Sequence, residues 1–71
     1  MNYTYADITK KLSKCGFIKD REGKGSHELW ANPATGQKLP IPRHGSHTLS
    51  KGVIKKIIFA TGLSNEQFHI L

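Results

Sequence analysis

The sequence is short of cysteine and has no long apolar run. Cys15 is the single cysteine among 71 residues, so an internal disulfide is impossible and a secreted disulfide scaffold is excluded. No stretch approaches the roughly 18 consecutive apolar residues of a membrane span, and no apolar signal segment follows Met1. A chain of this length can bury one small core. We therefore expect a single cytoplasmic domain over residues 1–71, with no membrane association.

Acidic residues are also scarce, with five Asp and Glu against eleven Lys and Arg and a formal net charge of +6. Between Leu29 and Asn65 there is no carboxylate at all, although that stretch contains Lys38, Arg43, Lys51, Lys55 and Lys56. Such a segment attracts polyanions, of which nucleic acid is the commonest inside cells. A solvated lysine face that aids solubility explains the pattern equally well.

The metal-binding residue types are present but not in a ligand pattern. The histidines are His27, His44, His47 and His69, and neither a Cys pair nor a His-Glu-x-x-His helix accompanies them. The carboxylates that two-metal nuclease chemistry would need are scattered, at Asp7, Asp20, Glu22, Glu28 and Glu66. We therefore expect no metal and no other cofactor.

Helix signals stand at both ends of the sequence. Thr4 and Asp7 predict a capped first helix that ends at Gly16, and Ser50 and Gly62 bound a second. Ser64 to Gln67 is a capping box for a short terminal turn. Phe59 falls on the lysine side of the second helix, and we expect Phe68 of the terminal turn to cover it rather than leave it exposed for a partner.

Three short strands are predicted between the helices, at residues 17–21, 26–31 and 37–41. Pro40 lacks a backbone donor, which places the last strand at a sheet edge or breaks it early. The order α-β-β-β-α predicts an α+β fold in which helices pack on one face of a three-stranded antiparallel sheet.

His27 is the histidine best placed for chemistry. It follows Lys24, Gly25 and Ser26 and opens the second strand, and an imidazole can give or take a proton near neutral pH. Strict alternation puts His27 on the face of Leu29, so it lies at the open end of the core if that face is the buried one. A histidine in a strand is nevertheless more often structural than catalytic.

A basic loop follows the third strand. Arg43 can bind phosphate in a bidentate manner, and His44 can hydrogen-bond to it. An ordinary basic loop that leads into a helix cap has the same composition.

The sequence contains several motifs in a definite order. They are Lys24-Gly25-Ser26-His27, Leu29-Trp30, a Pro-Gly hairpin, Ile41-Pro42-Arg43-His44 and Leu49-x-Lys51-Gly52 before an aliphatic helix. In this order the sequence resembles the HicA toxins, the toxin halves of type II toxin–antitoxin pairs, over nearly its whole length. The resemblance implies a double-stranded-RNA-binding-domain-like fold, ribonuclease activity on messenger RNA and inhibition by a HicB-like antitoxin. It places the family's catalytic histidine at His27 and not at His47, because only His27 has the Lys-Gly before it and the aliphatic-aromatic pair after it.

Our leading hypothesis is a toxin that cleaves mRNA as a metal-independent endoribonuclease and so inhibits translation. RNA supplies its own nucleophile, the 2′-OH, so the protein must provide a proton-transfer group and positive charge. His27 is the predicted catalytic residue, and the predicted RNA contacts are Lys24, Ser26, Lys38, Arg43, His44 and Lys51. The alternatives are a non-catalytic RNA-binding module of the same fold and a basic domain that binds an acidic protein.

Overall fold

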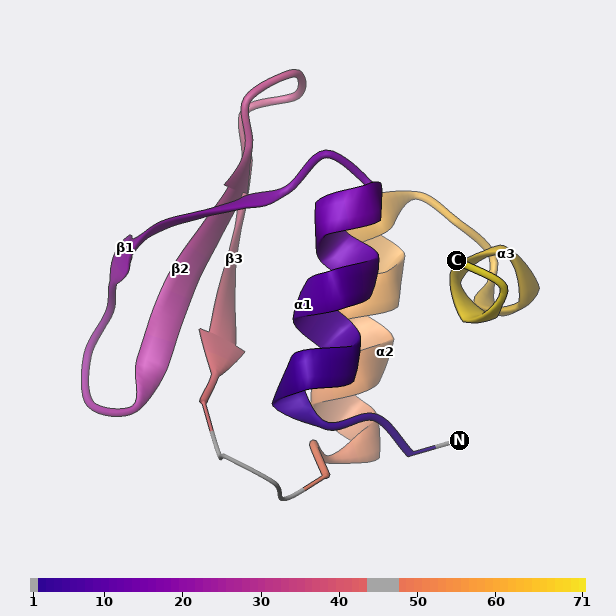
Figure 1. Ribbon diagram of the computed structural model, residues 1–71, viewed down its shortest axis with the longest axis horizontal. Helices are drawn as coiled ribbons and strands as arrows, with labels where there is room; N and C mark the ends of the chain where they lie inside the picture. The colour runs from indigo at the N-terminus through magenta and orange to yellow at the C-terminus, as the bar shows by residue number, and fades with distance from the viewer. Residues whose placement is uncertain (1, 44–47) are drawn as a thin grey trace.

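The computed structural model describes residues 2–43 and 48–71. In these residues the chain forms α1 (Tyr5–Lys14), β1 (Ile18–Glu22), β2 (His27–Asn32), β3 (Gln37–Pro42), α2 (Lys51–Thr61) and α3 (Asn65–His69) (Figure 1). The predicted α-β-β-β-α order, with its terminal helical turn, is confirmed, and it is consistent with a double-stranded-RNA-binding-domain-like fold. His44 and His47 lie outside the described residues. Of the helices described, none is long and apolar enough to cross a membrane.

The residues that bound α1 act as predicted. The Thr4 hydroxyl accepts from the Asp7 amide at 3.2 Å, and the Asp7 carboxylate accepts from the Thr4 amide at 3.0 Å. At the other end Gly16 takes a φ of 93°, which lets the Phe17 amide reach back to the Leu12 carbonyl at 3.0 Å. The turn buries Phe17 against the core, so β1 begins one residue later than predicted.

The predicted caps of α2 and α3 are also confirmed. Ser50 accepts from the Val53 amide at the start of α2, and Gly62 ends that helix with a φ of 77°. Ser64 and Gln67 form the capping box of α3. Before α2, the Leu49 amide donates to the Tyr3 carbonyl at 2.8 Å, so the start of the chain fixes where α2 begins.

The strands form an antiparallel sheet in the order β1-β2-β3, with α1 and α2 on one side of it (Figure 1). The prediction that Pro40 lies in an edge strand is confirmed, because within residues 2–43 and 48–71 the strand β3 pairs only with β2. The Arg43 amide donates to the Ser26 carbonyl at 2.8 Å, so odd-numbered residues here turn their backbone groups toward β2. Pro40 and Pro42 therefore face the open edge, where a missing N–H breaks no ladder bond.

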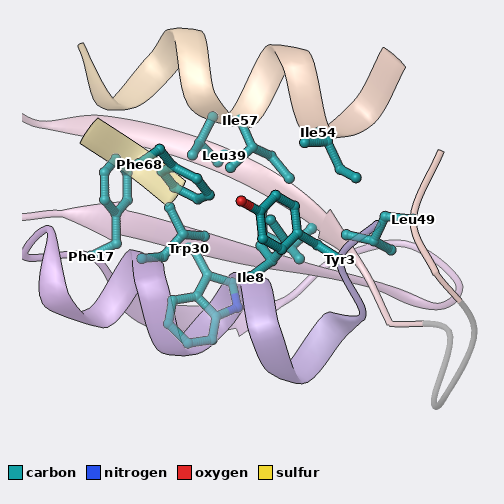
Figure 2. Close-up of a cluster of buried hydrophobic side chains, with 11 residues drawn as sticks. Tyr3, Ile8, Phe17, Trp30, Leu39, Leu49, Ile54, Ile57 and Phe68 are labelled. Carbon is teal, nitrogen blue, oxygen red and sulfur yellow. The ribbon is translucent and has the colours of Figure 1, made fainter. Parts of the chain in front are cut away.

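The buried face of β2 is the one that carries Trp30, so the condition under which His27 would lie at the open end of the core, burial of the Leu29 face, is not met. Trp30 is 8% exposed and lies with the buried Leu39 in the core cluster (Figure 2). On the same face Glu28, which is 1% exposed, pairs with Ile41. Burial of the Trp30 face is possible because the Glu28 carboxylate is fully satisfied there. Side chains alternate along β2, so His27 lies on the face opposite to Glu28 and Trp30, and it is exposed.

The expectation that Phe68 covers Phe59 is wrong. Phe68 is fully buried and packs edge-on against Tyr3, with ring centroids 5.9 Å apart, inside the core cluster (Figure 2). Phe59 is 86% exposed. The reason is helical geometry, since Phe59 points away from Ile54 and Ile57, the residues by which α2 faces the core.

Candidate active site

A tight turn between β1 and β2 positions His27. The His27 amide donates to the Lys24 carbonyl at 3.1 Å, and the His27 carbonyl accepts from the Gly23 amide at 2.9 Å. Gly25 takes a φ of 61°, a left-handed conformation that favours glycine and explains the Gly in this motif. His27 is thus fixed through its backbone while its side chain stays exposed.

His27 lines a pocket of about 300 Å³ at the open edge of the sheet, where β3 meets α2. The other lining residues, from those two elements, are Leu39, Pro40, Pro42, Val53, Lys56 and Ile57. The walls are thus mostly apolar, and the polar groups are an imidazole from β2 and an ammonium from α2. An apolar recess with a few convergent polar groups is the usual form of a binding site.

Lys24 and Ser26 are brought close to His27 by the same turn. Both are exposed. The Ser26 carbonyl holds the Arg43 amide and so joins this turn to the end of β3. The turn that carries Lys24 and Ser26 is thus held against the end of β3, and of its residues His27 lines the pocket.

Arg43 does not extend into that pocket as a phosphate ligand would. Its guanidinium Nη1 donates to Glu28 Oε2 at 3.1 Å, and Nη2 lies 3.7 Å from Glu22 Oε1. About half of the side chain remains exposed. In this arrangement Arg43 ties the end of β3 to β1 and β2, and it can meet a phosphate only in addition to these carboxylates.

Glu28 is the centre of this network, and sequence reasoning did not single it out. Its carboxylate accepts from the Tyr5 hydroxyl at 2.5 Å, the Trp30 indole at 3.1 Å and the Arg43 guanidinium, and Lys19 Nζ lies 3.3 Å away. Burial raises the pKa of Glu28, but the hydrogen bonds from Tyr5, Trp30 and Lys19 outweigh it and hold that pKa below its usual value. Burial, together with the bond to Glu28, raises the pKa of Tyr5.

Two of the predicted RNA contacts are not beside His27. Lys38 pairs with Ala31, whereas His27 pairs with Pro42, so the two lie roughly 13 Å apart along the sheet. Lys51 lines a different recess together with Tyr3 and His69 on the other side of α2. The structure therefore places Lys24 and Ser26 in the turn beside His27, outside the lining of the pocket, and leaves Lys38 and Lys51 farther away.

Lys56 lines the pocket, whereas Lys38 and Lys51 do not. It belongs to the carboxylate-free stretch, but nothing in that charge pattern distinguishes it from Lys55. The signal that could have found it is its spacing, because Lys56 lies three residues after Val53 and one before Ile57, at the border of the apolar arc. Because α2 packs beside β3, this border lines the same pocket as His27.

Among residues 2–43 and 48–71, no three His, Cys, Asp or Glu side chains gather as metal ligands would. Several carboxylates have structural partners instead: Asp7 caps α1, and Glu22 and Glu28 pair with Arg43 and Lys19.

Comparison with known proteins gives one family. A family model described as the HicA toxin of bacterial toxin–antitoxin systems matches residues 5–63. That range runs from the first residue of α1 past the end of α2 and includes every motif on which the resemblance rests. Among curated proteins, no sequence matches the chain.

Proposed function

The chain belongs to the HicA toxin family of bacterial toxin–antitoxin systems, and from this premise we propose that it is an endoribonuclease that cleaves mRNA without a metal ion. The placement of His27 carries the proposal. His27, whose side chain is exposed, lines the same mostly apolar pocket as Lys56, and the rest of the lining comes from the stretch between Leu29 and Asn65, which has no carboxylate. That combination suits a phosphodiester with its negative charge.

The proposed reaction uses the RNA's own 2′-OH. This oxygen loses its proton and attacks the neighbouring phosphorus, the bond from phosphorus to the 5′ oxygen breaks, and that oxygen takes up a proton. The products are a 2′,3′-cyclic phosphate and a 5′-OH. His27 performs the acid or base step, because imidazole exchanges protons readily near neutral pH.

Positive charge has to balance the extra negative charge that develops on the phosphate oxygens. Lys56 from α2 and Lys24 from the turn are the proposed cations, and Ser26 helps to orient the phosphate. Arg43 acts mainly by holding the end of β3 in place. Lys38 and Lys51 remain proposed contacts for RNA that extends beyond the pocket, and His44, which lies outside the described residues, remains a proposed RNA contact.

The proposed partner is a HicB-like antitoxin. Membership of a toxin–antitoxin family implies a cognate antitoxin. A basic surface that attracts RNA also attracts an acidic protein segment, so a neutralising partner can compete for the same face.

The proposal is tested with purified protein, single-stranded RNA and excess EDTA. We expect cleavage to persist in the chelator and to leave cyclic phosphate ends. His27→Ala and His27→Gln should remove cleavage and toxicity but retain the fold and antitoxin binding. An exposed side chain at a strand opening contributes little to stability, within about 0.5 kcal/mol.

His69→Gln is the matched control, because it removes an imidazole that lies outside the pocket. Circular dichroism and thermal melting verify that each variant is folded. Loss of cleavage in EDTA with recovery in Mg²⁺ would overturn the metal-independent mechanism. A folded His27→Ala variant that still cuts RNA would exclude His27 from the mechanism. A native protein that binds RNA but does not cut it would favour the alternative, a non-catalytic RNA-binding module.

A further inference from the structure

Phe59 is the most exposed large apolar side chain that the structure describes. The others are Ile18, on the edge strand β1, and Ile70, beside the C-terminus. Phe59 is thus a lone aromatic ring on the outer surface of α2 and not part of a wider apolar patch. A single exposed apolar side chain is common on protein surfaces, so a role for Phe59 depends on the residues around it.

Two lysines lie on the helical turn that precedes this ring. Lys55 and Lys56 precede Phe59 by four and three residues, so their side chains neighbour it on the helix surface. Gly52 lies one further turn back, where even an added Cβ would meet no atom within 4 Å. The outer face of α2 is therefore smooth, positive and centred on one aromatic ring.

This face is continuous with the His27 pocket. Lys56 lines that pocket with its helix neighbours Val53 and Ile57, and Phe59 is the next residue of the same helix face beyond Lys56. A phosphate that Lys56 holds in the pocket would have its neighbouring nucleotide over α2, within reach of the ring.

We propose that Phe59 is a base-stacking site for single-stranded RNA and that Lys56 holds the phosphate between this base and the His27 pocket. Stacking on an aromatic ring is tolerant of sequence, because every base has a π-face. The site therefore adds affinity for unpaired RNA without fixing which base is bound. The location rests on the proposed function, since it extends the same pocket.

The composition of the face favours RNA over a protein partner. Protein interfaces combine anchors with a wider apolar core that excludes water, whereas α2 here offers one ring beside two ammonium groups. Cations interleaved with aromatic rings are the arrangement that binds phosphates and bases together. A docked protein segment is accordingly the competing outcome of the test.

The test measures binding of a 2′-O-methyl oligonucleotide, which has no free 2′-OH and so cannot be cleaved. A second oligonucleotide of the same length with abasic sites presents the phosphates alone. We expect Phe59→Ala to weaken binding of the first by roughly 5- to 150-fold, the range for loss of one stacked base, and to leave the second unchanged. Phe59→Tyr should bind both as the native protein does, and Ile70→Ala is the control for loss of an exposed apolar side chain.

Equal affinity of Phe59→Ala and the native protein for the intact oligonucleotide would overturn the inference. So would an equal loss for both oligonucleotides, or a loss confined to antitoxin binding. Cleavage is measured separately with 2′-OH RNA, which keeps the two proposals apart. If the native protein does not cut RNA but Phe59→Ala weakens oligonucleotide binding, the proposed function fails and the stacking site is supported. If cleavage depends on His27 but Phe59→Ala binds as the native protein does, the stacking site fails and the proposed function is supported.

Discussion

Among single residues, Glu28 shows how a charge can lie in so small a core. Its carboxylate is almost inaccessible, yet α1, β1, β2 and the residue after β3 each contribute a donor to it. A buried carboxylate without such partners would cost several kcal/mol. Glu28 therefore joins these elements beside His27, its neighbour in the sequence.

This bonding makes stability depend on pH. The folded-state pKa of Glu28 lies below its usual value, so its contribution is present above about pH 4.5 and is lost as the pH falls through the lower, folded-state pKa. Glu28→Gln should lower the free energy of unfolding at pH 7 by roughly 1 to 3 kcal/mol. The difference in free energy of unfolding between the variant and the native protein should then become smaller as the pH falls.

Urea unfolding at pH 7 and at several lower pH values measures both effects. Glu66→Gln, at an exposed position in α3, controls for the removal of one negative charge. A free energy of unfolding of Glu28→Gln that stays below that of the native protein by the same amount at every pH would contradict this account.

At the scale of the elements, the end of α1 depends on one backbone conformation. Gly16 has a φ of 93°, which a residue with a Cβ adopts only with strain. Gly16→Ala should therefore destabilise the protein by roughly 1 to 2 kcal/mol. Gly52→Ala is the matched control, because Gly52 lies within α2 with open space around it, and alanine there should stabilise by up to about 1 kcal/mol.

Thermal melting measures both effects, and we expect the melting temperature to fall for Gly16→Ala and to rise for Gly52→Ala. A Gly16→Ala variant that melts at or above the temperature of the native protein would contradict the need for a left-handed residue at the end of α1.

The helix ends could be predicted because their signals are local. Thr4 with Asp7, and Ser64 with Gln67, satisfy backbone groups within one turn, so the sequence pattern and the structure contain the same information. The buried face of β2 could not be predicted in this way. Leu29 and Trp30 are both apolar and lie on opposite faces, and the choice between them depends on donors to Glu28 from distant parts of the chain.

The candidate site was predictable to the same extent. The turn that carries Lys24, Ser26 and His27 is local, and the structure brings these residues together. Lys56 comes from another element, and its place in the lining of the pocket depends on how α2 packs beside β3. Periodicity placed Phe59 correctly on the lysine side of α2, but whether the terminal turn covers that side depends on tertiary packing, which buries Phe68 in the core instead.

For the whole molecule, the net charge of +6 predicts RNA binding that weakens steeply as salt is added. Each phosphate contact with a single strand adds about 0.7 to the slope of log affinity against log salt. Lys56→Gln should therefore reduce the slope for a short oligonucleotide by about 0.7. Lys14→Gln, at an exposed position on α1, should leave the slope unchanged although it removes the same charge.

A longer oligonucleotide tests the outlying cations. Lys38 lies at the far end of β3 from His27, so Lys38→Gln should alter the slope only when the RNA is long enough to reach it. A change with the short oligonucleotide would mean that the RNA runs along the sheet and not over α2. Filter binding between about 50 and 200 mM salt measures these slopes.

The prolines of β3 have a consequence for how this sheet meets other chains. An edge strand is a template on which a foreign strand can extend the sheet, provided that its outward amides can donate. Along β3 the outward positions are Lys38, Pro40 and Pro42, so a strand laid there would find carbonyls to bond but an amide only at Lys38. Growth of the sheet on this side, whether by a second copy or by a partner, is thereby blocked, and the residues that frame the His27 pocket also keep the protein from aggregating through that edge.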